Sequence, residues 1–271
     1  MLLIVYYSQG YFYSYIDTQK FTMNDLYNEY YEQIQSYNII DDLFFHKVME
    51  DPEAAEEMIR VILGDKSIKV VSCIPQYSLR NIGNRSVVLD LLCEDSDKRV
   101  FNVEMQKENN TDQQRRMRYH ISNIDTRFVE KGVDYKNLPD IFSIMISDFD
   151  IFKADRTVYH IDRVLRETGS VKSNGIYEIY VNAHGSDESE VTNLMKYILD
   201  SNGFNPHFPK ISSRVEYFKH DNGGAEGMGK TIAELRAEER AEVLKNLGIS
   251  EEKYQKIVNK KNCKKEKIQL K

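Results

Sequence analysis

Two acidic residues near the middle of the chain stand where a metal ion can be held. Asp90 interrupts the apolar run of residues 87–92, and Glu104 lies in the alternating run of residues 101–106. A carboxylate among apolar neighbours is costly to bury unless it is paired or coordinates a metal. Two carboxylates held close together repel, so that one takes up a proton or a cation lies between them. This pair predicts a site for a hard divalent cation such as Mg²⁺, which prefers oxygen ligands.

A β-hairpin is the element expected to position the two acids. Two strand-forming runs flank the polar residues 94–98, a pattern typical of a hairpin. In the second run, residues 102, 104 and 106 are polar and alternate with apolar residues, so Glu104 shares a face with Gln106. If the strands pair, Asp90 and Glu104 project from one face. The alternative is that Asp90 is a satisfied buried acid, or faces water on an edge strand, with Glu104 an ordinary exposed residue.

The segments around the hairpin predict helices and strands that would enclose it. Helices are expected over residues 41–48, where Asp41 is the cap, and over residues 52–63, where Asp51 is the cap and Gly64 the stop. A strand follows over residues 68–74 and extends towards residue 79. Thr111, with Gln114 three residues on, predicts a capping box and a helix to about residue 131. Residues 141–146 read as a buried strand, which gives the order helix, three strands, helix, strand.

Five motifs in this order resemble the PD-(D/E)XK nuclease superfamily, and more closely its Rpn-like group of recombination-promoting nucleases and transposases. They are D-D-L-F-F-H-K at residues 41–47, V-L-D at 88–90, V-E-M-Q at 103–106, R-R-M-R-Y at 115–119 and Y-H-I-D-R-V at 159–164. The resemblance runs from about residue 40 to about residue 221. It implies an α/β restriction-endonuclease-like core, with a mixed central sheet flanked by helices in the order αβββαβ and a C-terminal helical extension.

The resemblance also implies roles for single residues. Asp90 and Glu104 are expected as metal ligands, joined by the backbone carbonyl of Met105. Gln106 occupies the position of the superfamily's usual Lys, and an amide can orient a water or contact phosphate but supplies neither a positive charge nor a base. Asp42 is expected as an auxiliary catalytic acid, or alternatively as a charge in the first turn of its helix. The catalytic set is therefore Asp90, Glu104, Gln106 and Asp42.

The expected activity is metal-dependent DNA endonuclease cleavage of the transposase or recombination-promoting type. Arg116, Arg118 and Tyr119 on the basic helix are the expected DNA contacts, although Arg116 and Arg118 also fit plain solvated helix charges. Mg²⁺ is the expected cofactor, with Mn²⁺ as a substitute. The alternative is a catalytically weak or inactive nuclease-fold module that binds DNA or another protein.

Composition bounds these expectations. The chain has 271 residues, of which 41% are hydrophobic and 30% charged, as in a soluble globular protein. Its net charge of −6 argues against a general nucleic-acid-binding surface, so DNA contact would need a local basic patch. Three cysteines without metal-ligand spacing indicate a reducing cytoplasm. The apolar N-terminus is too short to span a membrane, and a homodimer is left open as an assembly state.

Three parts are expected along the chain. Residues 1–39 form an N-terminal extension, residues 40–222 the nuclease-like domain, and residues 223–271 a linker, a charged helix and a Lys-rich tail. Residues 224–231 spell the phosphate-loop letters G-x-x-x-x-G-K-T. A working phosphate loop follows a hydrophobic strand, which is missing here, so the glycine-rich residues 221–230 are read as a linker.

Overall fold

The computed structural model describes residues 23–254 and 256, apart from residues 80–85 and 130–133. The chain divides into two compact units. The larger unit is Gln35–Asp221, and the smaller unit combines the parts of the chain before and after it. The expected division into residues 1–39, 40–222 and 223–271 stays a prediction.

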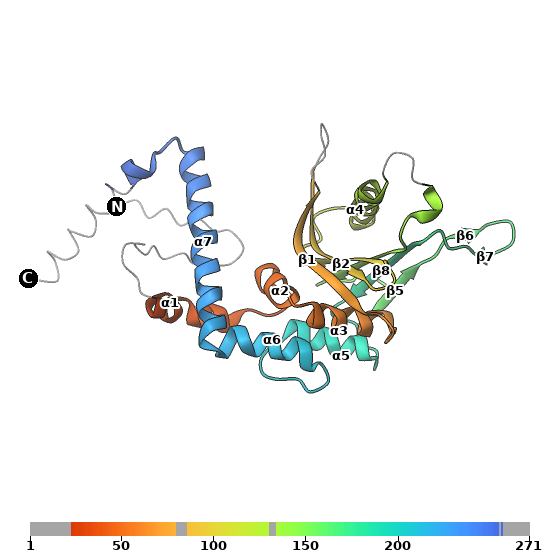
Figure 1. Cartoon of the computed structure of the whole chain (residues 1–271), viewed down its shortest axis with the longest axis horizontal. Helices are drawn as coiled ribbons and strands as arrows, with labels where there is room; N and C mark the ends of the chain where they lie inside the picture. The colour runs from red at the N-terminus through yellow and green to blue at the C-terminus, as the bar shows by residue number, and fades with distance from the viewer. Residues whose placement is uncertain (1–22, 80–85, 130–133, 255, 257–271) are drawn as a thin grey trace, which may run out of the picture. The chain divides into compact units, whose positions relative to one another are not determined.

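A mixed six-stranded sheet forms the centre of the larger unit (Figure 1). The β3–β4 and β4–β8 pairs are parallel, and the other neighbours are antiparallel. A separate two-stranded hairpin, β6–β7, projects beyond the ends of β5 and β8 (Figure 1). In spatial order the six strands are β1 (Val70–Leu79), β2 (Val87–Asp95), β3 (Val100–Gln106), β4 (Ile141–Ser147), β8 (Ile176–Asn182) and β5 (Val158–Ile161), and the hairpin is β6 (Val164–Leu165) and β7 (Ser170–Val171).

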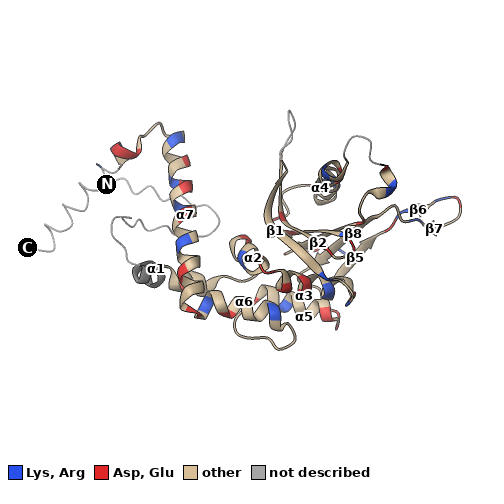
Figure 2. Cartoon of the chain, in the orientation of Figure 1, with Lys and Arg blue, Asp and Glu red and all other residues tan. Residues whose placement is uncertain are grey.

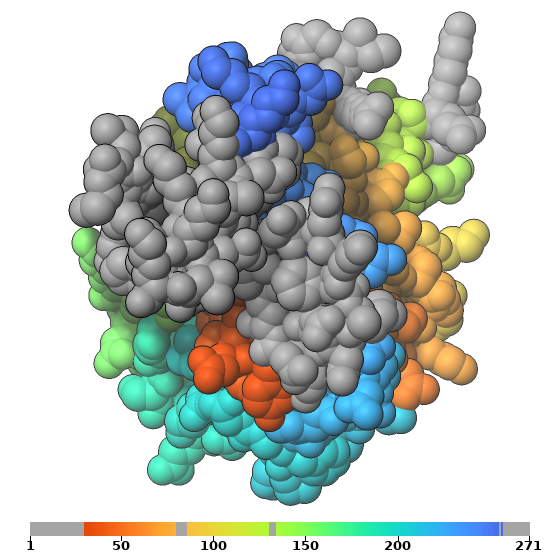
Figure 3. Space-filling model, turned by 90° about the vertical axis from the view of Figure 1, so that its left-hand side faces the viewer, coloured from red at the N-terminus to blue at the C-terminus, as the bar shows by residue number. Residues whose placement is uncertain are grey.

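Helices cover both sides of this sheet (Figure 1). Helix α4 (Gln113–Phe128) lies on one side, where Met117, Ile121 and Ile124 join the main apolar core. On the other side lie α3 (Pro52–Leu63), α5 (Glu190–Leu199) and α6 (Pro209–His220). The outer surfaces of α5 and α6 appear at the bottom of Figure 3. Helix α2 (Asp42–Met49) contacts β1 and β2, and a short 3-10 turn, Tyr135–Asn137, precedes β4. The order α3, β1, β2, β3, α4, β4 confirms the expected αβββαβ core.

Helix boundaries follow from local capping, with one correction to the sequence reading. The Asp51 side chain accepts hydrogen bonds from the N–H groups of Glu53 and Ala54, and Gly64 ends α3 with a φ of 64°. Both features were predicted. The predicted cap at Thr111 is wrong, because the side chain that accepts from Arg115 N–H is that of Asp112. The helix begins at Gln113, and the residue just before it, the N-cap, is the one whose side chain can accept from the N–H of the third helical residue, Arg115.

The expected linker is also wrong, because residues 222–246 form one continuous helix, α7 (Asn222–Asn246). Gly224, Ala225 and Gly229 are buried in it, and the packing of these small residues outweighs the weak helix propensity of glycine. Charged residues of both signs occur along the length of α7 (Figure 2). The phosphate-loop letters lie within this helix, where backbone N–H groups bond to the helix itself. A phosphate cradle is therefore not formed here.

Helix α1 (Met23–Ser36) belongs in part to the smaller unit with α7. Arg236 of α7 donates a hydrogen bond to the side-chain oxygen of Gln33 at 2.7 Å, and its guanidinium stacks over the Tyr30 ring. Across the described part of the chain, no helix has the length and apolar character that a bilayer crossing needs. Cys73 and Cys93 are free thiols on the paired strands β1 and β2.

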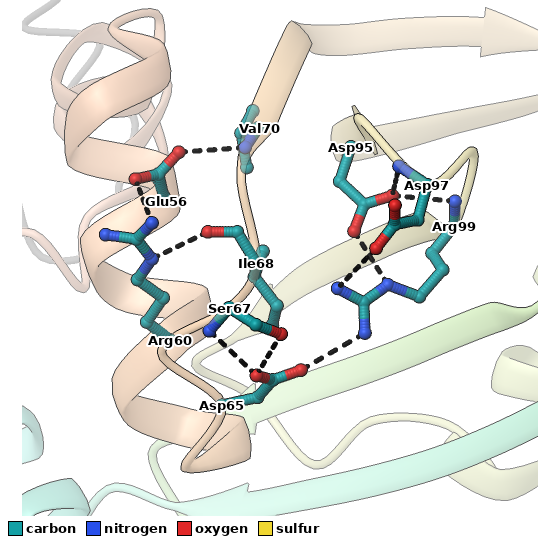
Figure 4. Close-up of polar contacts among 9 residues, drawn as sticks. All are labelled: Glu56, Arg60, Asp65, Ser67, Ile68, Val70, Asp95, Asp97 and Arg99. Atoms are coloured by element: carbon teal, nitrogen blue, oxygen red, sulfur yellow. Dashed lines mark hydrogen bonds and ion pairs between the residues drawn. The ribbon is translucent and has the colours of Figure 1, made fainter.

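A buried carboxylate fixes the turn of the β2–β3 hairpin (Figure 4). Asp95 is fully buried at its side chain and accepts hydrogen bonds from the backbone N–H groups of Asp97 and Arg99. The Arg99 side chain donates to Asp95 at 2.7 Å and to Asp65 at 3.1 Å, which ties the turn to the loop after α3. This turn sets the strand register that brings the two acids of the site together.

Replacing Asp95 by Ala should lower the free energy of unfolding by about 3 kcal/mol, because it leaves buried N–H groups and the Arg99 charge without their partner. Denaturant unfolding of the full chain measures this. The matched control is Asp97→Ala, whose side chain is 71% exposed and 3.9 Å from Arg99. That change should lower stability by less than about 1 kcal/mol. Equal losses for the two variants would contradict this account of the turn.

Candidate active site

The β2–β3 hairpin brings Asp90 close to Glu104. The antiparallel pairing ends with Leu91 opposite Val103, and Asp90 and Glu104 are the next residues on the two strands. The charge of Glu104 acts on the Asp90 carboxyl, as expected for neighbouring acids. The Asp90 side chain also accepts a hydrogen bond at 2.8 Å from the backbone N–H of Met105, the residue after Glu104. The hairpin therefore brings together the two acids that the sequence singled out.

Glu104 is a completely buried carboxylate without a hydrogen bond. Its side chain has no exposed surface, and neither oxygen has a hydrogen-bond partner within the described residues. Two side chains of α4 lie close to it. His120 Nδ1 is 3.1 Å from Oε1 without hydrogen-bond alignment, and an Arg116 guanidinium nitrogen is 3.5 Å from Oε2. A buried charge with its lone pairs unused is destabilising unless a cation takes them up.

The pKa of Asp90 is raised by its surroundings. Burial raises the pKa of its carboxyl to about 8, and the charges of Glu104 and Asp42 add to the rise. The Met105 N–H and the charge of Arg116 act in the opposite direction without offsetting it. At neutral pH and without a cation, Asp90 is therefore mostly protonated. A carboxyl with such a raised pKa beside a second acid is typical of functional sites.

Helix α2 brings two further potential ligands to Asp90. One ligand atom each of Asp42, His46 and Asp90 lies within 4.8 Å of the other two. Asp42 Oδ1 is 3.6 Å from His46 Nε2, and the Asp42 side chain is 72% exposed whereas His46 is buried. Burial lowers the pKa of His46 below its usual value, although Asp42 and Glu104 raise it in part. A neutral imidazole keeps a lone pair that can bind a metal.

Gln106 is held by two hydrogen bonds at the site. Its amide oxygen accepts from the Arg116 side chain at 2.6 Å, and its amide nitrogen donates to the Met105 carbonyl at 2.7 Å. The amide supplies no charge, but Arg116 places a permanent positive charge beside Gln106 and Glu104. The positive charge that the superfamily's Lys would supply from the strand is thus supplied by Arg116 of α4.

The other two predicted DNA contacts lie elsewhere on α4. Arg116 and His120 are four residues apart and share the helix face directed at Glu104. Arg118 is exposed and is rotated by about 200° from Arg116 around the helix. Tyr119 is 38% exposed and lies next to Arg116 around the helix. Contact of Arg118 and Tyr119 with DNA stays a prediction.

The sequence reading missed His46 and gave His120 no chemical role. The signal for each was a spacing of four residues, from Asp42 to His46 and from Arg116 to His120. Such a spacing places two side chains on one helix face. It does not reveal which strand the face meets, and that information comes only from the packing of α2 and α4.

These residues fit a divalent cation. The group contains several carboxylate oxygens, an imidazole and the Met105 carbonyl, which are common ligands of divalent ions in proteins. Within the described residues the Glu104 oxygens accept no hydrogen bond, and the pKa of Asp90 is raised; both features are what a missing positive charge produces. The identity of the ion is not fixed by this arrangement of oxygen ligands.

In metal-free buffer, the stability of the protein should fall as the pH rises from about 4 to about 8. The unfolded chain releases the Asp90 proton near its ordinary pKa of 3.8, whereas the folded chain holds it to about 8. Deprotonation therefore favours unfolding throughout this range. Relative to Asp90→Asn, the wild type should lose on the order of 2–4 kcal/mol between pH 5 and pH 8. Denaturant unfolding in EDTA measures the difference, and parallel pH profiles would contradict it.

Comparison with known proteins identifies the family of this chain. A family model described as PD-(D/E)XK nuclease family transposase matches residues 24–193, a range that includes every residue named in the site. Neither the curated proteins nor the solved structures gave a match. Because the match covers more than half of the chain, the protein belongs to the PD-(D/E)XK nuclease family of transposases.

Proposed function

We propose that this protein is a metal-dependent DNA endonuclease that hydrolyses phosphodiester bonds during recombination or transposition, with Mg²⁺ or Mn²⁺ as cofactor. The observation that carries the proposal is the buried carboxylate of Glu104, which has no hydrogen bond among the described residues and lies close enough to Asp90 to raise the pKa of its carboxyl. A purely structural protein gains nothing from two such acids, because an apolar pair of similar size would be more stable. The family supports a nuclease-type function.

The cation would be held by Asp90, Glu104 and the carbonyl oxygen of Met105. A bound divalent ion supplies Lewis acidity to the scissile phosphate and lowers the pKa of a water molecule. Asp42, at the exposed end of the site, assists as the auxiliary acid. The Met105 carbonyl currently accepts from Gln106, and its second lone pair is available to a ligand.

Arg116 and Gln106 act on the phosphate rather than on the cation. The Arg116 guanidinium has five N–H donors, and only some of them face Gln106 and Glu104. The others can bind a phosphate oxygen and stabilise negative charge as it develops during cleavage. Gln106 orients the guanidinium through its amide oxygen and can orient a water through its remaining donor.

DNA would approach along the exposed side of α4, where Arg118 and Tyr119 contact the backbone. The net charge of −6 means that such a local cationic surface, with the bound cation, must offset repulsion elsewhere. A cytoplasmic location and assembly as a homodimer are part of the proposal.

The full-length protein should nick supercoiled plasmid DNA in the presence of Mg²⁺ or Mn²⁺ and not in EDTA. Glu104→Gln should lower the rate by on the order of 100-fold or more, because the site loses a ligand and a negative charge. The unfolding temperature of the metal-free variant should not fall below that of the metal-free wild type, since a buried charge has been removed. Glu188→Gln, an exposed carboxylate outside the site, is the matched control and should leave nicking unchanged. Cleavage by Glu104→Gln at the wild-type rate would contradict the assignment.

Arg116→Ala should lower kcat by about 100-fold, because the developing charge on the phosphate loses its partner. The same change should leave divalent-ion affinity unchanged or higher, since Arg116 competes for the Glu104 carboxylate. Arg115→Ala removes an exposed neighbouring guanidinium that pairs with Asp112 and serves as the control. Single-turnover cleavage and calorimetric titration separate the two effects. Loss of metal binding with an unchanged kcat would assign Arg116 to the cation instead.

One observation favours a second candidate, a nuclease-fold module with weak or no catalysis that binds DNA or a partner protein. Gln106 carries no charge, and both ends of its amide are already bonded within the protein. If plasmid DNA is bound but not cut with any divalent ion, this second candidate is the correct one.

A further inference from the structure

A buried histidine of α2 has no part in the mechanism proposed above. His46 is only 6% exposed, and both of its ring nitrogens are buried without a hydrogen-bond partner within the described residues. A core histidine normally satisfies its nitrogens, because a buried unpartnered polar group costs about 1–3 kcal/mol. The position therefore calls for a ligand that the protein chain itself does not supply.

The surroundings of His46 are acidic and open towards solvent at one end. Asp42 lies one helical turn before it with its carboxylate 3.6 Å from Nε2, and Asp90 approaches from β2. The three ligand atoms lie within 4.8 Å of one another. Opposite ligands of a small divalent ion are about 4.2 Å apart, so minor side-chain adjustment suffices to enclose one. The exposed Asp42 carboxylate gives the ion a path of entry.

The donor set distinguishes between classes of cation. Mg²⁺ and Ca²⁺ bind to oxygen ligands, and Mg²⁺ keeps several waters rather than accept a protein nitrogen. Imidazole nitrogen suits first-row transition metals, whose affinity rises from Mn²⁺ to Co²⁺ and beyond. Two carboxylates with one imidazole thus form a mixed set that favours a transition-metal ion over Mg²⁺.

We propose that Asp42, His46 and Asp90 bind a divalent transition-metal ion, and that His46 makes the site prefer such an ion to Mg²⁺. This inference rests on the proposed function only in that both use a cation at Asp90. It restricts the expected cofactor to divalent ions that readily take an imidazole nitrogen as a ligand. It also gives α2 a direct role in holding the ion.

The test measures metal binding directly, without DNA. Metal-stripped full-length protein is titrated with Mg²⁺, Mn²⁺ and Co²⁺ by calorimetry, and the Mn²⁺ complex is studied by pulsed electron paramagnetic resonance for coupling to a ligand ¹⁴N. Wild type should bind Co²⁺ and Mn²⁺ more tightly than Mg²⁺ and show the ¹⁴N coupling. His46→Leu should weaken Co²⁺ binding by at least about tenfold and Mg²⁺ binding by less than about threefold, and lose the coupling.

Two comparisons separate a ligand from a packing residue. Since the buried His46 nitrogens make no hydrogen bond within the described residues, the metal-free His46→Leu variant should unfold at the same or a higher temperature than the wild type. His184→Gln is the control, because His184 is an exposed histidine that pairs with Asp148 and not with any of the three proposed ligands. It should change neither affinity nor coupling.

The outcomes distinguish this inference from the proposed function. Wild-type metal preference in His46→Leu, or a wild-type Mn²⁺ complex without ¹⁴N coupling, overturns the inference. If either result accompanies metal-dependent nicking, only the role of His46 fails. If the wild type binds no divalent ion at all, both the inference and the metal dependence of the proposed nuclease fail.

Discussion

The structure is organised around the repulsion between a fully buried carboxylate, Glu104, and a half-buried one, Asp90. The two acids lie on the neighbouring strands β3 and β2, and within the described residues neither Glu104 oxygen has a hydrogen bond to share its charge. This repulsion is reduced by the Arg116 guanidinium, 3.5 Å from a Glu104 oxygen, and by protonation of Asp90, whose pKa is raised to about 8. These two effects do not neutralise the pair completely. The remaining deficit of positive charge is what a divalent cation would supply.

The rest of the fold holds this unfavourable arrangement in place. Asp95 and Arg99 fix the hairpin turn and hence its register, while parallel pairing with β4 secures β3 from the other side. Helix α4 contributes Arg116 and His120 from one face, and α2 contributes Asp42 and His46. Proteins place strained or under-satisfied groups at functional sites and stabilise them through the surrounding structure. The distribution of polar groups here follows that pattern.

Much of this was predictable from the sequence, because it depends on local signals. An acid inside an apolar run and the alternation of residues 101–106 predicted the hairpin, and Asp51 and Gly64 predicted the ends of α3. The cap of α4 was misplaced by one residue, since Thr111 and Asp112 both suit a cap. The glycine-rich start of α7 was misread, because burial of this part of the helix outweighs the weak helix propensity of its glycines. His46 escaped notice because its meaning depends on which strand α2 packs against.

The most direct test of the central claim is anomalous diffraction from crystals of the full-length protein soaked in Mn²⁺. The account predicts a peak about 2.2 Å from carboxylate oxygens of both Asp90 and Glu104. A well-ordered site without a peak between these two side chains, or with their oxygens turned to other protein partners, would contradict it.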